Sequence, residues 1–472
     1  MMIERRGQGR REKIIPGMIQ IMEKNLTTGS VFQNIVFFSL PYLLSYFLQT
    51  LYGMADLFIT GQFNATASIT AVSIGSQVMH MLTVMIVGLA MGATVNIGQA
   101  VGAQKREQAA KTIGNTMILF MGLSVFLTVL LCLSVRPIVS LMSTPAEAVE
   151  GTVQYLTICF IGIPCITAYN IISSIFRGLG DSKSPMYFVA VACAVNIALD
   201  YLLIGGMQLG PMGAALGTTL SQTVSVIVSL CIILKQKTGI RLSRDCFKLQ
   251  PEIMRPILKI GVPVALQDGF VQIAFILITV IANQRGLNDA AAVGIVEKII
   301  SFLFLVPSSM LSTVSALSAQ NIGAGKHERA SATLYYAVMM CACFGLAVAA
   351  VIQFAAAPVV GLFDKTPEVV TLGSQYLRGY VWDCVFAGIH FSFSGYFCAY
   401  GKSGISFLHN VLSILLVRIP GAYLMSKLFP DTLLPMGCAA AAGSFLSVLV
   451  CVAAFCWLKR QSVYRNIRGN EG

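Results

Sequence analysis

The chain has 472 residues, of which 56% are hydrophobic and only 11% are charged, and its formal net charge is +12. Soluble domains average about a quarter charged residues, so this composition excludes an aqueous enzyme or a nucleic-acid-binding domain as the main body. Twelve units of equal length would each hold about 39 residues, enough for one membrane-spanning helix and a short loop. The composition therefore predicts a polytopic helical membrane protein.

Twelve apolar segments follow one another along the sequence. Each is predicted to be a helix, because lipid offers no hydrogen-bond partners to backbone polar groups. The predicted spans are residues 36–60, 68–98, 109–134, 149–175, 185–206, 211–234, 256–283, 291–320, 330–354, 370–398, 405–427 and 435–458. The sequence thus predicts an all-α protein with twelve transmembrane helices.

Lys and Arg are distributed unevenly between the loops. With the N-terminus inside, the inside segments hold 25 of the 32 Lys and Arg residues, and the outside loops hold four. The positive-inside rule therefore predicts a multi-pass protein of the cell (inner or plasma) membrane with both termini cytoplasmic. The basic run from Lys235 to Lys259 is then a cytoplasmic loop that can contact anionic membrane lipid. The positive charge needs no nucleic-acid partner.

The sequence contains an internal repeat. The stretch from Ala71 recurs from Ala292 at a constant offset of 221 residues, with ten identities over forty ungapped positions. This predicts a cytoplasmic arm (1–34), an N-lobe of six helices (35–235), a cytoplasmic loop (236–255), a C-lobe of six helices (256–459) and a cytoplasmic tail (460–472). Because six is even, both lobes enter the membrane from the same side and should be related by a pseudo-twofold axis along its normal. Such repeats are common in secondary transporters.

Five acidic residues lie inside the predicted spans, where a charge costs on the order of 2.5–3.5 kcal/mol. They are Asp56, Asp200, Asp268, Glu297 and Asp383. Asn196 precedes Asp200 by four residues and Tyr52 precedes Asp56 by four, so each pair shares a helix face. A carboxylate beside a carboxamide can bind a proton or a bare cation through oxygen.

The acids of the first half have no counterpart in the second. At an offset of 222, Asp56 corresponds to Ile278, and at an offset of 224, Asp200 corresponds to Leu424. An asymmetric pair of acids favours a single cation-coupling site in the N-lobe over a purely structural role in helix packing.

The other embedded acids are secondary candidates. Asp268 follows Pro263 closely and could cap or kink the seventh span, and Glu297 could be neutralised by the adjacent Lys298. Asp383 and His390 are seven residues apart, hence about 10 Å apart on one helix face, which leaves room for a bridging water or substrate.

Several motifs, in this order along the chain, resemble those of the multidrug and toxic compound extrusion (MATE) transporters. They are YGMADLFITG in the first span, the VGAQK and IGAGK loops, the FRGLGDSKSP turn and NIALD in the fifth span. The similarity runs from about Val31 to Leu458. It implies an antiporter in which H⁺ or Na⁺ moves down its gradient while a bulky, often cationic organic compound is exported.

The resemblance is to the damage-inducible and Staphylococcus-type branch, whose coupling site lies in the N-lobe. Carried over by position, that site would comprise six residues: Tyr52, Asp56, Asn170, Asn196, Asp200 and Thr218. The norfloxacin-exporter branch also uses C-lobe acids, at positions that here are Val271 and Ala387. This departure argues against coupling in the C-lobe, although Asp268 and Asp383 lie nearby.

The predicted function is therefore cation-coupled multidrug efflux by alternating access, carried out by a monomer without a metal or cofactor other than the coupling ion. A flippase of lipid-linked saccharide precursors is the alternative, which the embedded Arg418 favours and the scarcity of other embedded cations disfavours. A membrane-embedded enzyme would need a constellation such as HExxH or a nucleophile with its base, and the sequence has neither.

Overall fold

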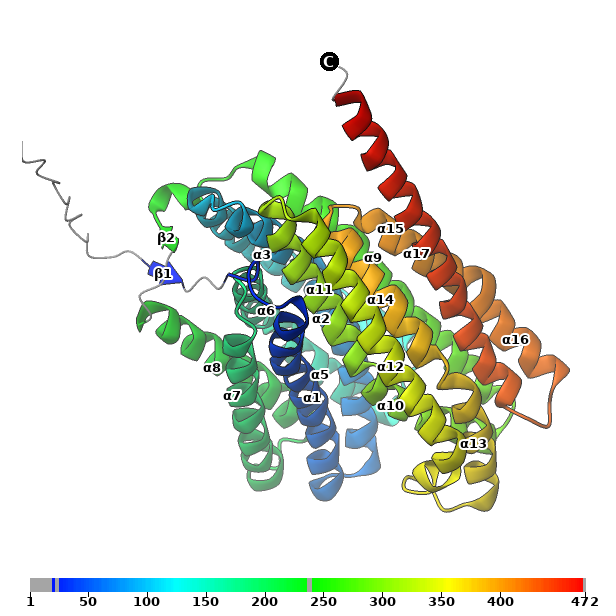
Figure 1. Ribbon diagram of the computed structural model, residues 1–472. Helices are drawn as coiled ribbons and strands as arrows, with labels where there is room; N and C mark the ends of the chain where they lie inside the picture. Colours follow the sequence, from blue (N-terminus) through cyan, green and yellow to red (C-terminus); the bar gives the residue numbers. More distant parts are fainter. Residues whose placement is uncertain (1–18, 22–24, 236–239, 470–472) are drawn as a thin grey trace, which may run out of the picture.

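The computed structural model describes residues 19–21, 25–235 and 240–469, which are helical apart from one pair of short strands (Figure 1). The helices are α1 (Val31–Phe63), α2 (Thr66–Gly102), α3 (Arg106–Leu133), α4 (Val135–Leu141), α5 (Val149–Ile161), α6 (Ile163–Gly178), α7 (Lys183–Asp200), α8 (Gly210–Lys235), α9 (Pro251–Asn283), α10 (Leu287–Leu303), α11 (Leu305–Gly323), α12 (His327–Val360), α13 (Pro367–Tyr380), α14 (Asp383–Ala399), α15 (Ser403–Ser413), α16 (Ile419–Leu428) and α17 (Leu434–Gly469). Strands β1 (Ile19–Ile21) and β2 (Ile240–Leu242) pair antiparallel. The strand pair was not predicted.

The predicted all-α polytopic fold is confirmed. Each of the twelve predicted spans coincides with one long helix or with two or three consecutive shorter ones. Among the described residues, ten helical segments are long and apolar enough to cross a membrane. The two helices Ala146–Ile161 and Ile163–Gly178, which meet at a bend, together form an eleventh. The remaining predicted span is divided between α13 and α14, each shorter than the 18 residues that this criterion requires.

Five of the predicted spans contain helix irregularities that hydropathy does not predict. In the eighth span, Phe304 separates α10 from α11. The fourth span bends by 50° between α5 and α6, where Pro164 in the first turn of α6 lacks the backbone N–H that a continuous helix would use. In the tenth span, Val381 and Trp382 separate α13 from α14. The fifth and eleventh spans each contain a π-helical turn, Tyr201–Gly206 (η2) and Ile414–Arg418 (η4). Short 3-10 turns lie at Ala146–Ala148 (η1) and Arg244–Phe247 (η3).

The helices form two lobes that meet along α2 and α11, with α7 and α8 on one side of the molecule and α16 on the other (Figure 1). Two hydrogen bonds across this boundary are reciprocal. Gln99 Nε2 of α2 donates to the Ala399 carbonyl (2.7 Å), and Gln320 Nε2 of α11 donates to the Gly178 carbonyl (3.1 Å). Both pairs obey the 221-residue offset. Such exchanged contacts are the signature of a twofold relation, here between the halves of one chain.

The same boundary is packed by close backbone contacts. A Cβ atom added at Gly102 would lie 1.9 Å from the Gln320 carbonyl oxygen, and one added at Gly323 would lie 2.0 Å from that of Gln99. An apolar cluster beside it joins the first turns of α1, through Ile35 and Phe38, to α11 and α12. The lobes are therefore closed against each other at the end where the α2–α3 and α11–α12 connections lie.

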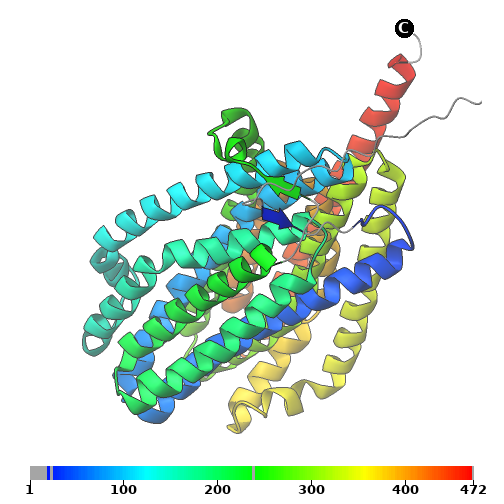
Figure 2. The ribbon, with the colours of Figure 1, turned by 90° about the vertical axis from the view of Figure 1, so that its left-hand side faces the viewer.

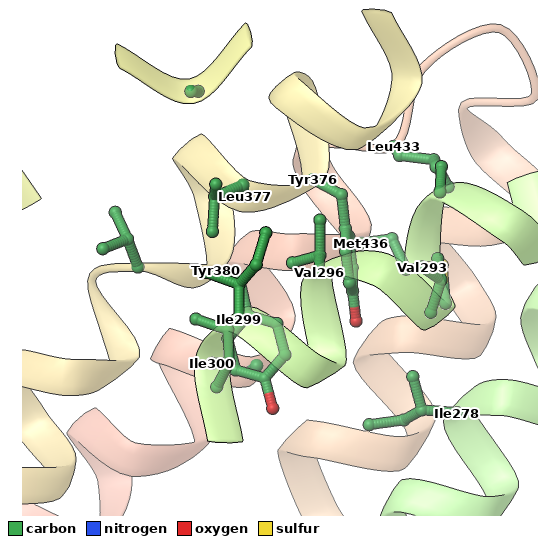
Figure 3. Close-up of a cluster of buried hydrophobic side chains, with 14 of the residues drawn as sticks. Ile278, Val293, Val296, Ile299, Ile300, Tyr376, Leu377, Tyr380, Leu433 and Met436 are labelled. Atoms are coloured by element: carbon green, nitrogen blue, oxygen red, sulfur yellow. The ribbon is translucent and has the colours of Figure 1, made fainter. Parts of the chain in front are cut away.

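Each lobe also has a core of its own. In the C-lobe, Tyr376 and Tyr380 of α13 project among Val293, Val296 and Ile300 of α10 (Figure 3). Residues of α9 and α17 complete this cluster. It fixes the orientation of the two tyrosine rings, whose hydroxyl groups point to one side of the cluster (Figure 3).

The described ends of the chain lie at the same end of the bundle. α17 continues as helix to Gly469 and extends beyond the other helices (Figure 2). The C-lobe begins with α9 at Pro251 rather than at residue 256, and α1 begins at Val31 rather than near residue 35. Of the predicted N-terminal arm, residues 1–18 and 22–24 lie outside the described residues, as do residues 236–239 of the inter-lobe loop and 470–472 of the tail.

The contact at Gly102 predicts that the stability of the protein is sensitive to substitution at this position. Gly102→Ala should destabilise the protein by about 1–3 kcal/mol, because the added methyl group would overpack the backbone contact between the lobes. The matched control is Gly122→Ala in α3, where no atom lies within 4 Å of an added Cβ. The measurement is the midpoint of thermal unfolding in detergent. An unfolding midpoint of Gly102→Ala at or above that of Gly122→Ala would contradict the contact.

Candidate functional site

Asp56 lies two turns before the C-terminal end of α1 and points into its own lobe. Its side chain is only 3% exposed, whereas Met54 and Phe58, which lie on the opposite face of the helix, are 48% and 63% exposed. Thr218 Oγ1 of α8 donates a hydrogen bond to Asp56 Oδ2 (3.2 Å). The position of Asp56 on the inner face of α1 therefore sets its carboxyl group against the helices of the N-lobe.

Asp200 is the last residue of α7 and is completely buried. Its carboxyl group lies close enough to that of Asp56 for the two to interact directly, and Asn196, one turn earlier on α7, lies beside the same carboxyl group of Asp56. The π-helical turn η2 begins directly after Asp200. Such turns often occur at functional sites because they re-aim the adjoining side chains.

Gly217 of α8 provides the space that the Asp200 side chain occupies. A Cβ atom at this position would lie 2.2 Å from Asp200 Oδ1. Every other residue type carries that atom, so glycine is required for α7 and α8 to approach with the carboxyl group between them.

The site has more oxygen acceptors than the protein supplies with donors. Asp56 Oδ1, both carboxyl oxygens of Asp200 and Asn196 Oδ1 are buried without a hydrogen-bond partner among the described residues, and Asn196 Nδ2 is the one donor beside them that also lacks a partner. Within residues 19–21, 25–235 and 240–469, no Lys, Arg or His forms an ion pair with the carboxyl group of Asp56 or of Asp200. Two carboxylates in contact cannot both stay ionised without a positive partner. The arrangement can accept a proton between the carboxyl groups or hold a bare cation through oxygen.

Two other predicted members of the site, Tyr52 and Asn170, differ in how they relate to Asp56 and Asp200. The hydroxyl group of Tyr52 lies near both Asp56 and Gln222, so it extends the site along α1. Asn170 of α6 is buried, but its amide donates to the Ile166 carbonyl of its own helix (2.8 Å). No contact of Asn170 with either acid is found among the described residues.

Two residues of the site were not predicted from the sequence, Gly217 and Gln222. Gln222 lies four residues after Thr218 and therefore on the same face of α8, which is a signal that the sequence carries. Gly217 adjoins Thr218, but many glycines occur in the spans and only the structure shows which of them adjoins a carboxyl group.

Asp268, a secondary candidate, lies at the boundary between the lobes. A Cβ atom at Gly88 of α2 would lie 2.6 Å from Asp268 Oδ2, so this carboxyl group of α9 faces the N-lobe. Leu266 and Ile273 are exposed on the other side of α9. Among the described residues, Asp268 has no ion-pair partner.

The expected pairing of Glu297 with Lys298 was wrong. Glu297 Oε2 accepts a hydrogen bond from Thr279 of α9 (3.1 Å) and faces the interior of the C-lobe, whereas Lys298 is exposed. Consecutive residues of a helix point in directions about 100° apart, so adjacency along the chain does not bring the two side chains together.

The secondary candidates Asp383 and His390 have different partners. Asp383 Oδ2 lies 3.4 Å from Arg418 Nη2, and both side chains are almost completely buried. His390 is buried with its ring against those of Phe391 and His409. Arg418 is thus buried and paired with Asp383 inside the C-lobe, so it does not supply the free positive charge that favoured a flippase.

Comparison with known proteins places this architecture in a family. A sequence model described as MatE matches residues 41–202 and 263–424, one stretch in each lobe. The chain belongs to the MatE family. It is therefore a multi-pass membrane protein of a multidrug efflux transporter family.

Individual relatives agree with this membership. The chain is 26% identical over 441 residues to "Probable multidrug resistance protein YoeA" of Bacillus subtilis, a match that covers 92% of this chain and 95% of the relative. It is 25% identical over 395 residues to "FAD transporter" of Shewanella oneidensis, covering 82% and 86%. A solved structure titled as the outward-facing conformation of a multidrug resistance MATE family transporter has a TM-score of 0.85 at 23% identity, and the match covers 92% of this chain and 98% of that one.

The close approach of Gly217 to the Asp200 carboxyl group allows a direct test of the site in this MatE protein. Gly217→Ala should reduce dye export at least tenfold without loss of insertion, because the methyl group would displace the Asp200 carboxyl group from Asp56. Gly53→Ala in α1 is the control, since no atom lies within 4 Å of an added Cβ there and Asp56 is three residues away. Export is measured as ethidium efflux from cells with matched amounts of each variant in the membrane. Equal efflux from the two variants would contradict the geometry described for Asp200.

Proposed function

We propose that this protein is a cation-coupled antiporter that exports bulky organic compounds, often cationic, by alternating access. The observation that carries the proposal is the contact between the carboxyl groups of Asp56 and Asp200, buried on two different helices of the N-lobe without a basic partner among the described residues. Such a pair is useful in a transporter whose cycle alternately neutralises the two carboxyl groups with a cation and exposes them to water.

The coupling follows from electrostatics. Burial disfavours a charged carboxylate, and a second carboxylate beside it adds repulsion, so the closed lobe favours the cation-loaded pair. A proton shared between Asp56 and Asp200, or Na⁺ held by their oxygens with Asn196 and Thr218, would remove both costs. When the site opens to water, the charged form is solvated and the cation can leave. A cation that stabilises one state more than the other is what allows its gradient to drive the cycle.

The arrangement of the lobes supports alternating access. They are held together at one end by the reciprocal bonds of Gln99 and Gln320, the end that the basic loops predict to be cytoplasmic. On that assignment the structure corresponds to a state closed toward the cytoplasm, in which the cation loads from outside and the exported compound is released. Both lobes come from one chain, so a monomer suffices for this cycle.

Asp268 supports a preference for cationic compounds. Its carboxyl group faces the opposite lobe at the boundary between lobes, and no ion pair neutralises it among the residues described. A compound with a positive charge would supply the missing partner. One relative is named a FAD transporter and others are named multidrug resistance proteins. Family membership therefore does not fix the charge of the exported compound, and the preference is inferred from Asp268 of this chain.

The proposal predicts that Asp200→Asn leaves the protein folded and inserted but abolishes cation-driven export, because the neutral amide cannot alternate between charged and cation-loaded forms. The matched control is Asp431→Asn, which changes an exposed acid. Export is measured in proteoliposomes that carry either a pH gradient alone or a Na⁺ gradient alone, which also identifies the coupling ion. Normal export by Asp200→Asn under the gradient that drives the unmodified protein would refute the proposal.

The hydrogen bond from Thr218 predicts a smaller effect. Thr218→Ala should change the apparent affinity for the coupling cation about fivefold, equivalent to the ~1 kcal/mol of a typical hydrogen bond. H⁺ binding should become stronger, because the Asp56 carboxylate loses a donor that stabilises its charged form, whereas Na⁺ binding should become weaker, because the ion loses an oxygen ligand. Thr223→Ala is the control, because Thr223 donates only to the Thr219 carbonyl of its own helix (2.9 Å). The concentration of H⁺ or Na⁺ that gives half-maximal export is measured for both. Identical values would show that Thr218 does not contact the cation.

A further inference from the structure

The C-lobe contains a buried polar cluster that involves the same two spans as the candidate site of the N-lobe, the fifth and the sixth of each lobe, although its acid, Asp383, comes from the fourth span and Asp56 from the first. In each lobe the cluster lies where the fifth span contains a π-helical turn. In the N-lobe Asp200 directly precedes the turn η2, and in the C-lobe Arg418 is the last residue of η4. The two stretches matched by the family model lie 222 residues apart. At that offset Arg418 aligns with Asn196, and at the offset of 224 that aligns Asp200 with Leu424 it lies two residues before the counterpart of Asn196.

The surroundings of the two clusters correspond as well. In the N-lobe, Gly217 makes room for Asp200, and the next residue, Thr218, donates to the carboxyl group of Asp56. In the C-lobe, an added Cβ at Gly443 would lie 3.1 Å from Cβ of Arg418, and the next residue, Ser444, lies beside the carboxyl group of Asp383. A glycine followed by a hydroxyl residue thus adjoins both clusters on the sixth span of each lobe, at an offset of 226 residues rather than 222.

The charges of the two clusters differ. The N-lobe pair has two carboxyl groups and no cation, whereas the C-lobe places the Arg418 guanidinium 3.4 Å from Asp383. Arg418 also donates to the Tyr380 hydroxyl group and stacks over the Phe275 ring, 5.3 Å from its centroid. The ionisable groups around Arg418 are those of Asp383, Glu297, Tyr376, Tyr380 and His390. A guanidinium stays charged at every physiological pH, so it neutralises Asp383 in all states of the cycle.

We propose that Arg418 is a tethered cation that occupies, in the C-lobe, the place that the coupling cation takes in the N-lobe. This inference rests on the proposed function, because it assigns the coupling of the cycle to one lobe. The carboxyl group of Asp383 is then permanently paired and offers no site for a mobile H⁺ or Na⁺. Arg418 thereby removes Asp383 from cation binding.

Removal of the guanidinium should open a second cation site. The test uses the full chain with Asp200→Asn, in which the N-lobe site is disabled, and compares it with the same chain carrying also Arg418→Met. We expect the double variant to bind one more cation per transporter, measured on purified protein as protons taken up when the pH is lowered and as radioactive Na⁺ retained. Arg418→Lys in the same background keeps the charge and should show no gain. Addition of Asp383→Asn to the Arg418→Met chain should abolish the gain.

A double variant that is monodisperse and binds no more cation than Asp200→Asn alone would overturn the inference. Where Arg418→Met does not yield folded protein, Asp383→Asn in the otherwise unmodified chain tests the same point. We expect it to leave the number of bound cations unchanged, and a loss of one would mean that Asp383 is itself a mobile-cation site. Export by Asp200→Asn is recorded separately, so failure of the proposed function and failure of this inference give different results.

Discussion

This structure depends on one physical constraint, the burial of two carboxyl groups in contact with each other. Among the described residues, no basic side chain forms an ion pair with either of them. Asp56 and Asp200 come from different helices and are completely or almost completely buried. Both cannot remain charged unless something positive joins them. The π-helical turn after Asp200, the space at Gly217 and the hydroxyl group of Thr218 all serve to hold the two groups together in spite of that cost.

The duplicated architecture makes this constraint asymmetric. The lobes share their helix order, their reciprocal contacts through Gln99 and Gln320, and the π-helical turn of the fifth span of each lobe. What differs is the charge of the buried polar cluster beside the fifth span, where the N-lobe has two acids without a basic partner among the described residues and the C-lobe has an acid paired with an arginine. In the proposed cycle, the symmetric scaffold lets the lobes move against each other, and the asymmetric charge pattern makes one of them sensitive to a cation. Duplication followed by divergence of a few buried residues is sufficient to produce this combination.

The sequence predicted much of the fold and a large part of the site. Hydropathy predicts the spans because lipid requires continuous helices, and the four-residue spacing of Asn196 and Asp200 places them on one face. That Asp56 meets Asp200 could be expected only from the family resemblance, because periodicity within one helix does not determine which helices pack together. For the same reason the Arg418–Asp383 pair was not predicted. The bend at Pro164 and the two π-helical turns depend on tertiary packing, which no local pattern records.

The central claim is that Asp56 and Asp200 form one cation-sensitive unit, and infrared difference spectroscopy of the purified protein tests it most directly. Spectra are recorded as the pH is lowered and, separately, as Na⁺ is added. We predict a carboxyl-group signal in one of the two titrations, produced by protonation or by Na⁺ coordination, that is lost in both Asp56→Asn and Asp200→Asn. A signal that persists unchanged in either variant would show that the two acids do not act as a unit and would contradict the account.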